Sequence, residues 1–143
     1  MGARHSGREA ALQMLFQMEV AGADPEETIV LFWRNFGAEV DLESRAYADE
    51  LVRGTWCLLE ELDAQLAVTS THWRLERMAR VDRNILRIGA WELAHKRDVP
   101  RAVVLDEAVE LAKAFGTDES SAFVNGVLNA LADRLGRSDD ERR

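Results

Sequence analysis

Five arginines in the middle of the chain have the spacing of a recognition surface. Arg74, Arg77, Arg80, Arg83 and Arg87 recur every three or four residues, which places several of them along one side of a helix. Guanidinium groups suit bidentate contacts to phosphate or carboxylate groups. Three interpretations stay open. The arginines form a solvated ridge, or Arg83 or Arg87 reaches an acid on a neighbouring helix and ties the halves of the chain together. The third interpretation is a docking surface for an RNA backbone or an acidic partner.

A second candidate is the connection 115–121, with the sequence FGTDESS. It precedes a predicted helix, and the free N–H groups of a helix N-terminus can bind an anion. Thr117, Ser120 and Ser121 add hydroxyl groups. Asp118 and Glu119 can neutralise the helix dipole themselves, so ordinary capping competes with anion binding and is the favoured interpretation.

Motifs for catalysis are missing from the sequence. The three histidines are far apart, and no HExxH, CxxC, phosphate-binding GxxxxGK[ST] or GxSxG motif occurs. Cys57, beside Leu58, is the only cysteine and is interpreted as a small core residue. Asn125-Gly126 lies within a helical pattern, where the glycine is expected to let another helix approach closely. The sequence predicts no enzyme, no metal site and no cofactor.

The charge is acidic overall but unevenly distributed. The 143 residues carry 18 basic and 26 acidic side chains, a net charge of −8, and sixteen of the basic residues are arginine. Residues 19–63 hold three basic and twelve acidic groups, whereas residues 74–101 hold eight basic and four acidic groups. Since an acidic molecule repels phosphate, a nucleic-acid role requires local patches or a basic partner.

The composition is that of a globular protein, with 47% hydrophobic residues, nine glycines and two prolines. No apolar run approaches the roughly 20 residues of a membrane span. The first ten residues, MGARHSGREA, have no apolar core of a secretory signal. We therefore expect a cytoplasmic protein without a membrane partner.

Hydrophobic periodicity predicts an all-helical fold. Ser6 and Glu9 have the spacing of a capping box, and Asp24-Pro25 is typical of a helix start. Gly22, Gly37 and Gly116 are expected to stop helices. The predicted helices span about 6–21, 25–36, 41–67, 74–79, 81–95, 101–115 and 118–136.

The uncharged segment 64–73 divides the chain. We predict one domain, 1–143, built from two packed helical subdomains. Its N-terminal half covers about 5–68, its C-terminal half about 73–136, and residues 137–143 are expected to be a frayed tail.

Four motifs together resemble the NusB family of bacterial transcription antitermination factors. Residues 81–93 (VDRNILRIGAWEL) resemble VDRxILRxxx[YW]EL, and residues 103–116 (VVLDEAVELAKAFG) resemble Vx[IL]NEAVELAKx[FY]G. Residues 120–128 (SSAFVNGVL) resemble SxxFVNGVL, and residues 8–16 (REAALQMLF) resemble the family's N-terminal motif. The match runs in order from about Arg4 to Leu131.

The resemblance implies an all-helical, NusB-like fold of two subdomains without enzymatic activity. It also implies a partner, NusE, which is a small-subunit ribosomal protein. The pair is expected to bind the boxA element of nascent ribosomal RNA transcripts and to support the processivity of RNA polymerase in an antitermination complex. A helical protein–protein adaptor with weak or no RNA binding stays open as the alternative.

The resemblance also implies site residues. The residues expected to bind RNA are Arg4, His5, Arg8, Gln13, Phe16, Lys113, Phe115, Gly116, Thr117, Glu119, Ser120, Phe123 and Asn125. The residues expected to bind NusE are Glu76, Arg77, Arg80 and Asp82. The chain departs from the family at residues 4–8, where it has RHSGR and the family has RRxAR. It also departs at Asp106, where the family has asparagine. Both changes reduce the attraction for phosphate.

Overall fold

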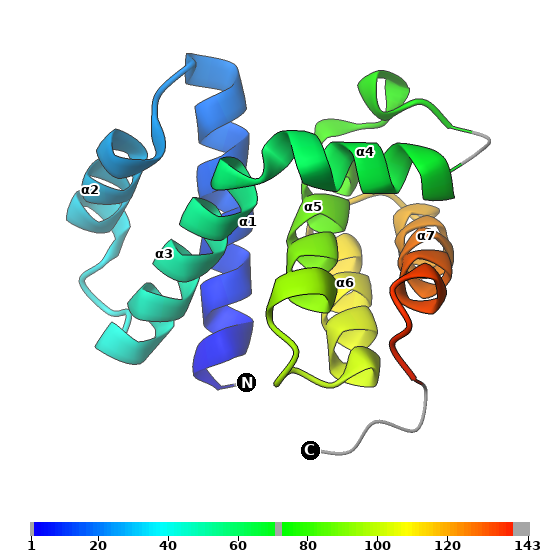
Figure 1. Ribbon diagram of the computed structural model, residues 1–143. Coiled ribbons are helices and arrows are strands. Elements are labelled where there is room, and N and C mark those ends of the chain that lie inside the picture. Colours follow the sequence, from blue (N-terminus) through cyan, green and yellow to red (C-terminus); the bar gives the residue numbers. More distant parts are fainter. Residues whose placement is uncertain (1, 71–72, 139–143) are drawn as a thin grey trace. The chain divides into compact units, whose positions relative to one another are not determined.

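The computed structural model describes residues 2–70 and 73–138 (Figure 1). In these ranges the chain forms seven α-helices and one 3-10 turn, without a strand, which confirms the predicted all-helical class. The helices are α1 (Ala3–Ala21), α2 (Pro25–Phe36), α3 (Leu42–Cys57), α4 (Leu59–Thr69), α5 (Arg80–His95), α6 (Arg101–Phe115) and α7 (Ser120–Arg134), with the 3-10 turn η1 at Leu75–Arg77. Within the same ranges, no helix has both the length and the apolar character that a bilayer crossing needs.

The chain divides into two compact units, the first ending at Cys57 and the second beginning at Leu58. This boundary lies inside the segment 41–67, for which the sequence predicts one continuous helix. The helix is interrupted at Leu58, whose φ of −108° and ψ of 22° are not helical. Because α4 contacts η1, α5 and α7, it belongs to the second unit and not to the N-terminal half.

In the first unit, α1 packs against α3, and α2 contacts both. Met14, Leu15 and Met18 of α1 and Leu51 of α3 are fully buried. The two long helices meet closely at Gly7, where an added Cβ would lie 3.0 Å from the carbonyl oxygen of Ser44. A larger residue at this position would have to push α3 away.

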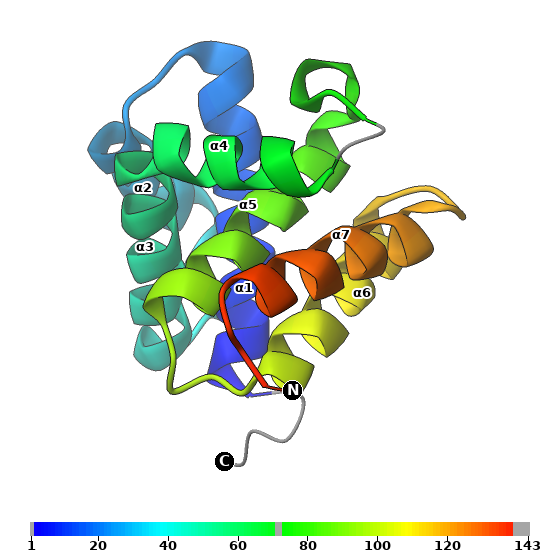
Figure 2. The ribbon, with the colours of Figure 1, turned by 45° about the vertical axis from the view of Figure 1, so that its right-hand side comes forward.

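In the second unit, α5 is the central helix and contacts α4, α6 and α7; Figure 2 shows it among them. The close approach predicted at Gly126 is wrong, because an added Cβ there would meet nothing within 4 Å. Gly89 has this role instead, since its Cβ would lie 2.7 Å from Cδ1 of the buried Leu128 on α7.

Two predicted helix starts have different outcomes. Asp24 accepts a hydrogen bond from the N–H of Glu27 at 2.9 Å, which confirms the cap of α2. The predicted capping box is wrong, because α1 begins at Ala3 and Ser6 lies inside it. The short helix predicted over 74–79 is only the three-residue turn η1.

The start of α3 depends on Asp41. Its carboxylate accepts hydrogen bonds from the N–H and the hydroxyl of Ser44 at 2.8 and 3.1 Å. The backbone hydrogen bond first, and the hydroxyl second, hold the pKa of Asp41 below its ordinary value of 3.8. A lowered pKa stabilises the fold above the unfolded value, and this contribution is lost as the pH falls through the folded pKa.

We therefore expect Asp41→Ala to lower the melting temperature at neutral pH by a few degrees. The difference in melting temperature between the variant and the parent protein should persist down to about pH 4 and become smaller at lower pH. Thermal unfolding followed by circular dichroism from pH 7 to 2.5 measures this. A difference that stays constant over the whole range would contradict the role of the carboxylate.

Two buried arginines hold the end of the second unit. Arg137 is 3% exposed and donates hydrogen bonds to the carbonyl oxygens of Leu93 at 2.8 Å and Val99 at 2.6 Å. Arg101 in turn donates to the carbonyl oxygen of Arg137 at 2.6 Å and to Asp133 at 2.9 Å. The predicted frayed tail is therefore wrong at Arg137, while residues 139–143 lie outside the described residues.

Candidate nucleic-acid interface

The second unit has a cavity of about 180 Å³ at its surface. Its lining residues are Trp73, Arg77, Met78, Ala79, Asp82, Thr117, Glu119, Ser120 and Phe123. Four of them come from the predicted RNA set and two, Arg77 and Asp82, from the predicted partner set. The fold thus brings together two groups of residues that are about 40 positions apart in the sequence.

An aromatic pair borders this cavity. The rings of Trp73 and Phe123 meet edge to face, with centroids 6.0 Å apart and planes at 78°. Trp73 is 57% exposed and Phe123 is half-buried, so both rings have free surface. Sequence analysis missed Trp73. Its signal was a large aromatic residue at the end of an uncharged segment, immediately before the row of arginines.

Asp82 is the most distinctive polar group of the cavity. Its side chain is half-buried in the first turn of α5, and among the described residues its Oδ1 accepts no hydrogen bond. A buried acceptor without a donor costs free energy, typically about 1–3 kcal/mol.

The row of arginines splits into a structural part and a surface part. Arg87 is buried and makes two hydrogen bonds of 2.8 Å to the carboxylate of Asp63 on α4. Arg83 donates to the carbonyl oxygen of Leu75 at 3.0 Å. The predicted pairing with a neighbouring helix is confirmed for Arg87. The pair does not tie the two units together, because Asp63 and Arg87 both lie in the second unit. The other three arginines, Arg74, Arg77 and Arg80, are exposed.

The connection between α6 and α7 is organised by Ser120. This residue is 2% exposed, and its Oγ accepts a hydrogen bond from the N–H of Thr117 at 3.0 Å. Gly116 is required beside it, because an added Cβ would lie 2.5 Å from the same Oγ. Ser120 therefore positions the loop, and exposed Thr117 and Glu119 are the residues that a ligand can reach.

The remaining predicted RNA residues of the second unit are on or near the surface. Lys113 and Phe115 are exposed on the last turn of α6, where Phe115 leaves 39% of its surface accessible. Lys113 lies 3.8 Å from the carboxylate of Glu110. Asn125 is half-buried on α7.

In the first unit, the two predicted phosphate-binding arginines differ. Arg4 is exposed, and its guanidinium lies 4.9 Å from the ring centroid of Tyr47. Arg8 lies 5.5 Å from the same centroid but is only 2% exposed, so its guanidinium does not face solvent. His5 is half-buried, with its Nε2 3.4 Å from the carboxylate of Glu9.

Farther along α1, Gln13 and Phe16 are exposed, and the ring of Phe16 leaves 42% of its surface accessible. The first unit therefore offers Arg4, Gln13 and Phe16 on its surface. The second unit offers the cavity and its aromatic pair.

Comparison with known proteins gives one consistent result. The model of the NusB family matches residues 5–133. A transcription antitermination protein NusB from Sorangium cellulosum is 58% identical over 142 residues, which cover 99% of this chain and 100% of that protein. The NusB of Myxococcus xanthus is 45% identical, covering 96% and 99% of the two chains.

Solved structures agree with this. NusB from T. maritima aligns with a TM-score of 0.81 at 31% identity, covering 93% of this chain and 92% of that one. A NusB chain solved with NusE and double-stranded RNA aligns with a TM-score of 0.83 at 27% identity, covering 94% and 98%.

Proposed function

Because the chain belongs to the NusB family, we propose that it is an antitermination factor that binds boxA-type single-stranded RNA together with NusE. It would do so on nascent ribosomal RNA transcripts in the cytoplasm, as part of a complex that keeps RNA polymerase processive. The relatives named as antitermination proteins support the role in antitermination, and the neighbour solved with NusE and double-stranded RNA supports NusE and RNA as partners. The function is that of a binding protein and requires no catalytic step.

The observation that carries the proposal is the cavity of the second unit. It combines two partly exposed aromatic rings, a cation at Arg77 and the half-buried carboxylate of Asp82. Single-stranded RNA is commonly recognised by stacking its bases on aromatic rings and by hydrogen bonds to their edges. The cavity offers both aromatic rings and polar groups to an RNA base. Arg77 and Asp82, which belong to the expected NusE-binding residues, line the same cavity.

The acidic charge explains why a partner is needed. At a net charge of −8 the isolated protein repels phosphate over long distances. A basic partner bound next to the RNA would supply the missing positive field. We therefore expect the free protein to bind RNA weakly and the complex with NusE to bind it tightly.

A titration of labelled boxA RNA tests the function. Fluorescence anisotropy should give an affinity at least tenfold higher for the equimolar mixture with NusE than for either protein alone. An RNA of the same composition in scrambled order should lose most of this gain. If NusE binds but adds no affinity for boxA over the scrambled RNA, the protein is an adaptor and the proposal is wrong.

The aromatic residues give a sharper prediction. Phe123→Leu and Phe16→Leu keep most of the apolar volume but remove the ring, and base stacking on a ring is worth about 1–3 kcal/mol. We expect each to weaken boxA binding by the complex about tenfold, with a small change in melting temperature. Phe32→Leu is the matched control, because Phe32 is only 5% exposed. It should lower the stability and leave the RNA affinity unchanged. A steep loss of stability for Phe16→Leu or Phe123→Leu without a loss of affinity would make that ring a core residue.

Arg4 should contact RNA phosphate. Each phosphate of single-stranded RNA that a protein neutralises contributes about 0.7 to the slope of log K against log salt. Arg4→Ala in the complex should therefore flatten that slope by about 0.7. Arg8→Met, which removes a buried guanidinium, should change the stability instead. A slope that responds to Arg8 and not to Arg4 would contradict this assignment.

A further inference from the structure

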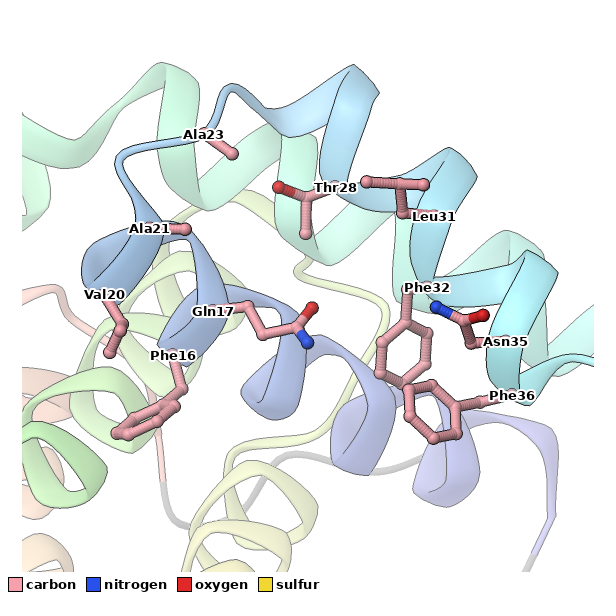
Figure 3. A pocket seen from close by; sticks show the side chains of 10 residues that line it. All are labelled: Phe16, Gln17, Val20, Ala21, Ala23, Thr28, Leu31, Phe32, Asn35 and Phe36. Carbon is pink, nitrogen blue, oxygen red and sulfur yellow. The ribbon is translucent and has the colours of Figure 1, made fainter.

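The first unit has a larger and more apolar cavity than the second. It measures about 390 Å³ and lies between α1 and α2 (Figure 3). We call it the α1–α2 groove; its lining residues are Phe16, Gln17, Val20, Ala21, Ala23, Thr28, Leu31, Phe32, Asn35 and Phe36. Val20, Leu31 and Phe36 are 58%, 46% and 57% exposed, so large apolar side chains line the groove and face solvent.

The groove has the form that accepts a helix. Phe16 and Val20 line it from α1, and Leu31, Phe32 and Phe36 line it from α2, as Figure 3 shows. Two helices joined by the short connection 22–24 thus form its walls. An amphipathic helix can lay its apolar face into such a groove. Because α2 has 12 residues, which span roughly 18 Å, about three turns of a partner helix would fit along it.

The charge around the groove determines which helix fits. From Glu9 to Arg53, which includes most of α1 and α3 and all of α2, the chain has ten carboxylates and three basic residues, and Arg53 pairs with Glu26 of α2. Glu27 is exposed one turn before Leu31, and Asp24 is exposed in the connection. This imbalance attracts a cationic partner.

We propose that the α1–α2 groove is the docking site of a basic amphipathic helix of a protein partner. The apolar face of that helix covers Val20, Leu31 and Phe36, and its lysines or arginines face the surrounding carboxylates. The residues that line the groove are different from those that line the cavity of the second unit. Phe16 belongs both to the groove and to the residues proposed to bind RNA, so the test of the groove uses Leu31, which is not among those residues.

A synthetic helix tests the site. The probe is a peptide of leucine and lysine, about 18 residues long, with its leucines on one face. Two further peptides serve as comparisons: one has glutamate in place of lysine, and the other has the same composition without an apolar face. Titration calorimetry should give an affinity at least tenfold higher for the first peptide than for the other two. Amide shifts in NMR spectra should concentrate in α1 and α2.

Two matched substitutions decide whether the groove is used. Leu31→Ser removes an apolar contact within the groove without changing charge. Val30→Ser removes a side chain that is 56% exposed on the same helix but does not line the groove. Leu31→Ser should weaken the lysine peptide at least tenfold while Val30→Ser leaves it unchanged, and both variants should keep their helicity and boxA affinity.

Three results would overturn the proposal. Equal effects of Leu31→Ser and Val30→Ser would show that the peptide binds by charge alone. Displacement of the peptide by boxA RNA would assign the groove to nucleic acid. Self-association in sedimentation experiments that Leu31→Ser abolishes would assign the groove to a second copy of the chain.

Discussion

Arg137→Met is expected to lower the free energy of unfolding by about 3 kcal/mol, because it removes a buried cation that holds the end of the second unit. The substitution keeps the apolar stem but removes the donors to the carbonyl oxygens of Leu93 and Val99. Hydrogen bonds from a charged donor are worth about 1.5–3 kcal/mol each, and buried acceptors that lose their donor are costly. For a chain of this size the melting temperature should fall by roughly 10 °C.

Urea unfolding followed by circular dichroism measures this effect. Arg134→Met is the matched control, since Arg134 is exposed at the end of α7, and it should change the stability by less than about 0.5 kcal/mol. If the two variants unfold at the same urea concentration, the hydrogen bonds of Arg137 contribute nothing and the end of the second unit is held by other contacts.

Asp82→Lys is expected to weaken NusE binding at least about 30-fold, which corresponds to about 2 kcal/mol. The wild-type carboxylate is half-buried and lines the cavity, so a cationic side chain of the partner would pair with it. Losing one member of a buried charge pair costs about 2–5 kcal/mol. The lysine would also lie near Arg77, which lines the same cavity.

Surface plasmon resonance with immobilised NusE separates this effect from simple repulsion. Glu76→Lys is the control because the Glu76 side chain is 72% exposed, and it should lower mainly the association rate. Asp82→Asn removes the charge but keeps the size of the side chain, so it serves as a second test variant if Asp82→Lys does not fold. The partner surface lies elsewhere if Asp82→Lys and Asp82→Asn keep their helicity and the affinity and association rate of NusE stay unchanged.

Local signals were sufficient for several elements. The start of α2 is predictable because Asp24 and Pro25 act on their immediate neighbours, and the observed cap confirms it. The limits of α6 at 101–115 follow from Pro100 before it and Gly116 after it, which agree with the observed helix. In these cases the residues that decide the structure lie next to each other in the sequence.

Other features depend on contacts that the sequence pattern does not contain. Leu58 favours a helix by its own propensity, yet its backbone is not helical, and the helix that follows it packs on η1, α5 and α7. The same holds for the candidate site. Arg8 and Ser120 have residue types that bind phosphate, but the fold buries both. Trp73 became a candidate only when Phe123 was found beside it.

The close approach of Gly89 to Leu128 constrains how the second unit can evolve. Since a Cβ at position 89 would lie 2.7 Å from the end of the leucine side chain, alanine is accommodated there only if residue 128 becomes smaller or turns away. A larger residue at 89 therefore requires a change or movement of the side chain at 128, whereas a smaller residue at 128 requires no change at 89. A family-wide comparison should find correlated changes at these two sites, with a small residue at 128 wherever 89 is not glycine.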